Sequence, residues 1–156
     1  MFERILLAVD TWDQAKGAVA TAIDLVTKSR GEVLIVHVHD TGLVSRETVD
    51  ETQAEARLLT AATFGVLAKR TTRALGGLRV GQSAGVARQI LHEAKDFGAD
   101  TIVLGSRGLG GFAGLPLGSV AHRVIQLADC PVVVARAAET TGAVHARDEG
   151  RTATVA

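Results

Sequence analysis

Residues 94–119 read AKDFGADTIVLGSRGLGGFAGLPLGS, and this stretch decides the fold. It contains the end of an expected helix, a short apolar run at residues 101–104, a glycine-rich segment and the start of another helix. A short apolar run between two helices is typical of a strand that is buried on both faces of a parallel sheet. The stretch therefore predicts one strand–loop–helix unit of an α/β domain.

The same alternation extends in both directions along the chain. Further strands are predicted at residues 5–9, 33–38, 78–82 and 132–134, and helices at residues 13–30, 48–74, 83–97 and 119–128. We expect Asp13 and Ser83 to cap their helices, Gly76-Gly77 to end the long helix, and Gly98 to end the one before the stretch quoted above. Strands that alternate with helices predict a doubly wound parallel sheet with helices on both faces.

The composition is that of one globular domain. The chain has 156 residues, of which 47% are hydrophobic and 22% charged, so general disorder is excluded. Lys+Arg and Asp+Glu number 17 each, which argues against the basic surface of a nucleic-acid-binding protein. We predict a domain over residues 1–136 and a mobile tail over residues 137–156, where the apolar periodicity stops.

The single cysteine and the apolar runs bear on location. Cys130 has no second cysteine to pair with, so a reducing compartment is expected, and its setting before an apolar strand indicates a buried small side chain. The first residues lack the long apolar segment of a secretory leader, and no apolar run approaches the roughly 18 residues that span a membrane. We therefore expect a cytoplasmic protein without a membrane or nucleic-acid partner.

The glycine-rich segment at residues 105–118 is the candidate binding loop. It is longer than the roughly 2–6 residues that usually join a strand to a helix in α/β units. Its glycines allow a ligand to approach the main chain, and Gly118-Ser119 opens a helix whose free N–H groups attract anions. Because ligands of doubly wound folds bind at the carboxyl ends of the strands, Asp10, which closes the first strand, belongs to the same edge.

These features predict a polyphosphate site, with two residues left open. Ser119 is either a phosphate ligand or simply a helix N-cap, and Arg107 is either a phosphate ligand or an ordinary exposed arginine. A dinucleotide fingerprint at residues 108–113 is rejected, because Pro116 separates it from the helix. The chain has no Walker A motif.

Two histidines two residues apart raise the possibility of a metal. His37 and His39 share one face of their strand, but no third ligand is evident in the sequence. We therefore assign no protein-borne metal site and no catalytic residue.

The glycine spacing resembles a known motif. Gly105-x2-Gly108-x9-Gly118-Ser119 matches G-x2-G-x9-G-[ST], the ATP-binding motif of universal stress proteins, and the resemblance covers nearly all of residues 1–136. It implies a five-stranded sheet in the order 3-2-1-4-5, of the adenine nucleotide alpha hydrolase-like type, and a homodimer. It also implies ATP as the ligand, with Mg²⁺ or Mn²⁺.

The resemblance also implies roles for single residues. Asp10 and the main chain of Val38 would hold adenine and ribose, whereas the glycines and Ser119 would hold the phosphates. The full set of predicted nucleotide-binding residues is Val9, Asp10, Thr11, Val38, Gly105, Ser106, Arg107, Gly108, Gly118, Ser119 and Val120. Family members commonly have Gly-Ser after the aspartate, but Thr11-Trp12 stand here, which leaves the ribose side open. Trp12 either packs over the nucleotide or shields the first helix.

The function expected from this reading is an ATP-binding regulatory module in the stress response. The alternatives are a slow ATPase or nucleotidyl-transferring enzyme of the same fold group, and a structural dimer whose site stays empty. The apolar strand at residues 132–134 ends the ordered part of the chain and is expected at an edge of the sheet. Because an apolar edge favours pairing, we expect a homodimer through this strand.

Overall fold

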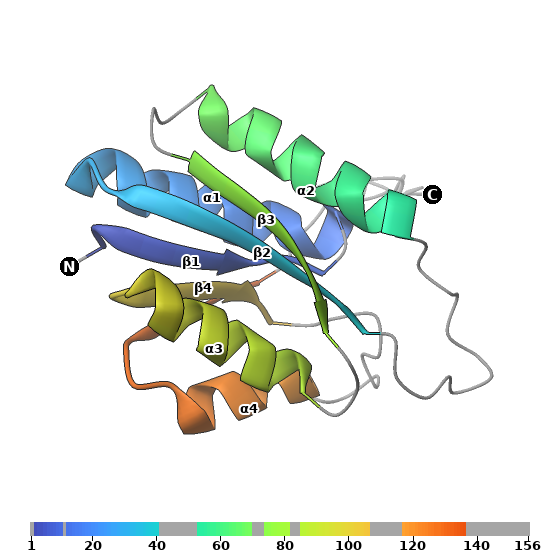
Figure 1. Cartoon of the computed structure of the whole chain (residues 1–156). Helices are drawn as coiled ribbons and strands as arrows, with labels where there is room; N and C mark the ends of the chain where they lie inside the picture. The colour runs from blue at the N-terminus through green and yellow to red at the C-terminus, as the bar shows by residue number, and fades with distance from the viewer. Residues whose placement is uncertain are drawn as a thin grey trace, which may run out of the picture.

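The structure is a computed structural model that describes residues 2–10, 12–40, 53–69, 74–81, 85–106 and 117–136. Strands and helices alternate along the chain (Figure 1). The elements are β1 (Arg4–Ala8), α1 (Trp12–Ser29), β2 (Glu32–Asp40), α2 (Gln53–Ala68), β3 (Ala74–Gly81), α3 (Val86–Phe97), β4 (Thr101–Gly105), α4 (Ser119–Leu127) and β5 (Val132–Ala135). The predicted tail at residues 137–156 lies outside the described residues.

All the strand pairs are parallel, and the sheet has the order β3-β2-β1-β4-β5. The predicted doubly wound fold and its strand order are therefore confirmed. Figure 1 shows α1 and α2 on one face of the sheet and α3 and α4 on the other. Among the described residues, none of the helices combines the length and the apolar character needed to cross a bilayer.

Two hydrophobic cores, one on each face, explain the continuous apolar runs. Ile5 and Leu7 of β1 belong to the core beneath α1 and α2, whereas Leu6 and Ala8 belong to the core beneath α3 and α4. Successive side chains of a strand point to opposite faces, so a strand that is covered on both faces needs apolar residues at every position. β1 lies at the centre of the sheet and meets this demand from Ile5 to Ala8.

Several predicted element boundaries were wrong. α1 begins at Trp12, so Asp13 lies inside that helix, and the N-cap of α3 is Gly85, not Ser83. α2 ends at Ala68, and Gly76-Gly77 lies within β3, paired with Ile35 and Val36 of β2. Pairing with a neighbouring strand outweighs the low strand propensity of glycine. Gly98 does end α3 in the left-handed conformation, as predicted.

Side-chain hydrogen bonds hold the amino edge of the sheet together. The Asp100 carboxylate accepts hydrogen bonds from the main-chain N–H groups of Phe2 (3.1 Å) and Glu3 (2.8 Å). It also accepts one from the Thr101 hydroxyl at 3.0 Å. Partial burial opposes ionisation of Asp100, but these hydrogen bonds outweigh it, and the pKa of Asp100 is lowered from its ordinary value. This anchor joins the start of β1 to the start of β4.

Candidate functional site

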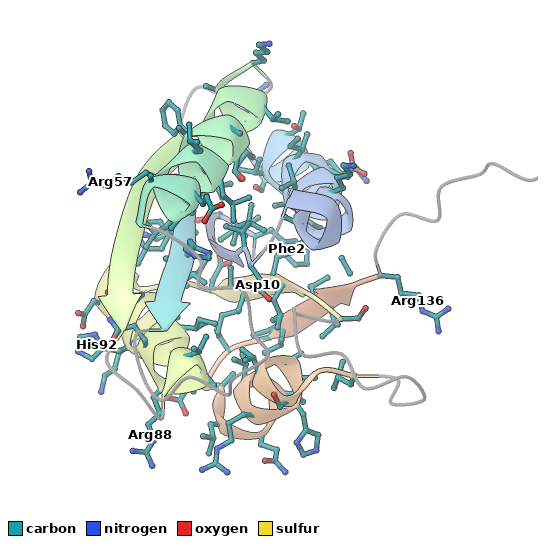
Figure 2. The ribbon with its side chains drawn as sticks, turned by 90° about the vertical axis from the view of Figure 1, so that its right-hand side faces the viewer. Phe2, Asp10, Arg57, Arg88, His92 and Arg136 are labelled. Atoms are coloured by element: carbon teal, nitrogen blue, oxygen red, sulfur yellow. The ribbon has the colours of Figure 1, made fainter. Side chains whose placement is uncertain are left out.

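The chain changes direction within the sheet between β1 and β4. From β1 it proceeds to β2 and β3 on one side and then crosses over to β4 and β5 on the other. Such a switch point leaves a crevice at the carboxyl ends of the two central strands, where doubly wound proteins bind ligands. Figure 2 looks onto this edge, and Asp10 lies near the middle of the view, between the α1/α2 layer and the α3/α4 layer.

Two hydrogen bonds close the base of the glycine-rich loop. The Gly118 N–H donates to the Ser106 carbonyl at 2.7 Å, and the Ser106 N–H donates to the Ala135 carbonyl at 2.8 Å. The end of β4, the start of α4 and the end of β5 therefore meet at one place. Arg107 and Gly108 belong to the part of the loop outside the described residues.

The start of α4 resolves one of the open alternatives. Gly118 is the N-cap, and Ser119 is the first residue of the helix, so the interpretation of Ser119 as an N-cap is wrong. Gly118 accepts the first main-chain hydrogen bond of the helix, from His122 N–H at 2.9 Å. The N–H groups of Ser119 and Val120 precede this bond and belong to the turn whose donors have no partner within the helix. The exposed Ser119 side chain stands beside them.

The backbone conformation of Gly118 does not itself demand glycine. Its φ of −69° and ψ of 155° are extended values that any residue adopts. A ligand that approaches the helix start closely would, in contrast, require the absence of a side chain. Gly118 therefore differs from Gly98, whose φ of 67° favours glycine for conformational reasons alone.

The carboxyl end of β1 is held by β2. The Val9 N–H donates to the Val36 carbonyl at 3.0 Å, and the Val9 carbonyl lies 2.8 Å from Nδ1 of His37. Val9 is buried, whereas Asp10 and Val38 are half-buried beside it. His37, which is buried, was not among the predicted site residues. The signal for it is a polar residue inside the otherwise apolar run at residues 33–38.

The predicted site residues thus fall into three groups. Val9, Asp10 and Val38 lie at the ends of β1 and β2, and Gly105, Ser106, Gly118, Ser119 and Val120 lie where β4 meets α4. The remaining ones, Thr11, Arg107 and Gly108, lie outside the described residues, as does the side chain of Trp12.

The labelled arginines and the possible metal ligands bear on what this edge could bind. Arg57, Arg88 and Arg136 all point away from Asp10 in Figure 2. Within the described residues, no group of three or more His, Cys, Asp and Glu side chains could hold a metal ion. None of these three arginines points toward Asp10, whereas the main-chain N–H groups at the start of α4 are described donors suited to an anion.

The sequence of the whole domain matches a known family. The model of the universal stress protein family matches residues 1–136. The chain belongs to the universal stress protein family. Universal stress protein YxiE of Bacillus subtilis is 31% identical over 154 residues, a match that covers 87% of this chain and 100% of the relative.

Solved structures of universal stress proteins share the fold of this family member. One from Archaeoglobus fulgidus, solved in complex with dAMP, is 25% identical, with a TM-score of 0.64 over 85% of this chain and 96% of that chain. Another, solved in complex with cAMP, has a TM-score of 0.67 over 86% of this chain and 97% of that chain. At 20% identity, this second likeness supports the fold alone. Both of these neighbours bind an adenine nucleotide.

Proposed function

We propose that this universal stress protein binds ATP at the carboxyl edge of its sheet and acts as a nucleotide-dependent regulatory module in the stress response. The observation that carries the proposal is the 2.7 Å hydrogen bond from Gly118 N–H to the Ser106 carbonyl. This bond holds the start of α4 against the end of β4, next to the crevice at the switch point. An anion-binding helix start and a ligand crevice are thereby combined at one edge.

The phosphates bind at the α4 end of this site. The N–H groups of Ser119 and Val120 and the partial positive charge of the helix start neutralise them. Gly105, Gly108 and Gly118 allow the phosphates to reach the main chain, and the Ser119 hydroxyl adds a donor. Ser106 and Arg107 complete this side, with Arg107 supplying a permanent charge.

Adenine and ribose bind at the β1 end. Asp10 accepts hydrogen bonds from the nucleoside, the main chain of Val38 contacts adenine, and Val9 and Thr11 flank them. The support for this half is the position of Asp10 between the two helix layers at the carboxyl edge of the sheet, together with the dAMP complex of the Archaeoglobus fulgidus relative. The two halves lie on adjacent strands, β1 and β4, as one ligand with a base and a phosphate tail requires.

The residues of this edge fit a divalent cation that the nucleotide brings with it. Mg²⁺ is usually held by phosphate oxygens, water and one or two carboxylates. The described residues offer no ready-made cage of three or more ligands, and we assign the Asp10 carboxylate to the nucleoside. Mg²⁺ or Mn²⁺ would therefore be held mainly by the phosphates.

Two measurements test the proposal. Purified protein is denatured, and the released small molecules are identified by mass spectrometry; an adenine nucleotide is expected. Calorimetric titration with ATP, GTP and adenosine should then show binding of ATP and of adenosine, and weaker binding of GTP. A folded, ligand-free protein that binds neither ATP nor adenosine at millimolar concentration would contradict the proposal. ATP turnover measured on the same sample separates a regulatory module from a slow ATPase.

A further inference from the structure

The pairing of β1 with β2 determines where the main chain of Val38 points. In parallel pairing, alternate residues of a strand direct their N–H and C=O groups toward the same neighbour. Val36 faces β1, because its carbonyl accepts the Val9 N–H at 3.0 Å. Val38 follows two residues later and faces the same side. The regular continuation of the ladder would be a hydrogen bond from the Val38 N–H to the Val9 carbonyl.

A side chain takes the place of that bond. Nδ1 of His37 lies 2.8 Å from the Val9 carbonyl oxygen. The hydrogen bonds between described residues include no main-chain donor to this oxygen. A carbonyl oxygen only accepts hydrogen bonds, so Nδ1 of His37 must carry the proton. The β1–β2 pairing accordingly ends at Ala8↔Val36, one step before Val9 would pair with His37.

We propose that His37 is a positioning residue that caps β1 with its imidazole and so directs the Val38 main chain at the adenine. The cap satisfies the buried Val9 carbonyl without using the Val38 N–H. The Val38 N–H and C=O then face the space beyond the end of β1, where the ligand lies. The same bond fixes the peptide between Val9 and Asp10 and hence the position from which Asp10 meets the nucleoside. The part of this proposal that concerns adenine binding rests on the proposed function, whereas the capping of β1 does not.

The burial of His37 explains why an imidazole suits this role. His37 is 1% exposed, and it lies on the face of β2 opposite Val36 and Val38, which contribute to the core beneath α3 and α4. A rigid ring holds one donor at a fixed place with little rotational freedom, and a buried carbonyl without a donor is costly. With an aliphatic side chain at residue 37, the Val9 carbonyl would instead accept a hydrogen bond from the Val38 N–H. That bond would extend the β1–β2 ladder and occupy the N–H group that we assign to adenine.

Two substitutions of His37 distinguish the loss of the hydrogen-bond donor from the change in side-chain shape. His37→Asn places an amide N–H where Nδ1 stands and should keep the cap, whereas His37→Leu removes it. Thr63→Val is the matched control, because Thr63 is also buried and donates to the Leu59 carbonyl at 2.8 Å within α2. It therefore removes a buried hydrogen bond that lies outside the proposed site.

The binding experiment is a titration of each folded variant with adenosine and with ATP. His37→Leu should weaken both ligands by the same factor, about tenfold or more, because the lost contact is on the nucleoside side. His37→Asn should stay within about threefold of the parent, and Thr63→Val should bind as the parent does. Unchanged binding by His37→Leu, or equal losses of affinity in the Asn and Leu variants, would overturn the proposed effect of His37 on nucleoside binding.

A ligand-free experiment tests the cap itself. Nitrogen-15 NMR of the parent protein should show a proton on Nδ1 of His37, and the Val38 amide should exchange with solvent faster than the Val36 amide. An Nδ1 without a proton, or a Val38 amide as protected as that of Val36, would overturn the cap. If the parent protein binds neither adenosine nor ATP, the proposed function fails, and this experiment alone decides the role of His37.

Discussion

Replacing Gly118 by valine tests the phosphate half of the site. The new side chain would stand at the N-cap of α4, beside the N–H groups of Ser119 and Val120 that we assign to the phosphates. A hydrogen bond to a charged group contributes about 1.5–3 kcal/mol. Displacing the phosphates from even one of these donors should therefore weaken ATP binding by at least about tenfold, which corresponds to roughly 1.4 kcal/mol.

The fold should tolerate this change. The φ of −69° and ψ of 155° at Gly118 suit valine, and the N–H that bonds the Ser106 carbonyl is retained. Valine is a poorer N-cap than glycine, so we expect a stability loss of about 1 kcal/mol. Gly85→Val is the matched control, because Gly85 is the N-cap of α3 and a Cβ there would meet Arg88 at an ordinary distance of 3.4 Å. It should leave ATP binding unchanged; because its φ of −155° and ψ of 30° differ from those of Gly118, its own loss of stability is measured in parallel.

Calorimetric titration of the variants with ATP and adenosine separates the two halves of the site. Gly118→Val should weaken the binding of ATP but not that of adenosine, because its effect is on the phosphate side. Asp10→Ala should weaken both ligands, because its proposed contacts are with the nucleoside. The reasoning is refuted if Gly118→Val is folded and binds ATP as tightly as the parent does.

Four other predictions concern stability, assembly and reactivity. Gly31→Ala should lower the melting temperature by many degrees, because a Cβ there would lie 2.7 Å from the Glu3 carbonyl carbon; a melting curve that overlays the parent's would contradict this. Asp100 has a lowered pKa in the folded state, so its contribution to stability is present above the unfolded carboxyl pKa of about 3.9 and is lost as pH falls through the folded value. Denaturant unfolding between pH 6 and 2 should accordingly show a smaller decline for Asp100→Asn than for the parent, and equal declines would count against the anchor. Val133→Lys in the edge strand β5 should shift a homodimer toward monomer in light scattering, whereas a parent protein that is already monomeric would exclude that dimer. Burial and the charges of Asp100 and Asp129 raise the pKa of the Cys130 thiol, so alkylation at pH 8 should be slower than that of a free cysteine; equal rates would show that the thiol is accessible and unperturbed.

Local sequence patterns predicted the alternating elements of this protein and the region of its candidate site. The continuous apolar runs, such as residues 5–9, require strands that are covered on both faces, and this requirement leads to a parallel sheet with two helix layers. The glycine spacing from Gly105 to Gly118 identified the candidate loop, because glycine permits close approach of a ligand wherever the chain is placed. These inferences depend on the hydrophobicity and the backbone freedom of individual residues, which are the same wherever a residue lies in the fold.

The tertiary structure decided what depends on distant partners. Gly76-Gly77 looked like a helix terminator, but pairing with β2 places it inside a strand. The sequence left Ser119 open between a phosphate ligand and an N-cap, and the structure gives the N-cap to Gly118, whose N–H donates to the Ser106 carbonyl. His37 and His39 raised the possibility of a metal, and only the tertiary structure places Nδ1 of His37 at 2.8 Å from the Val9 carbonyl, 28 residues away in the chain. Tertiary context overrides local propensities, and no local pattern records which partner a donor will meet.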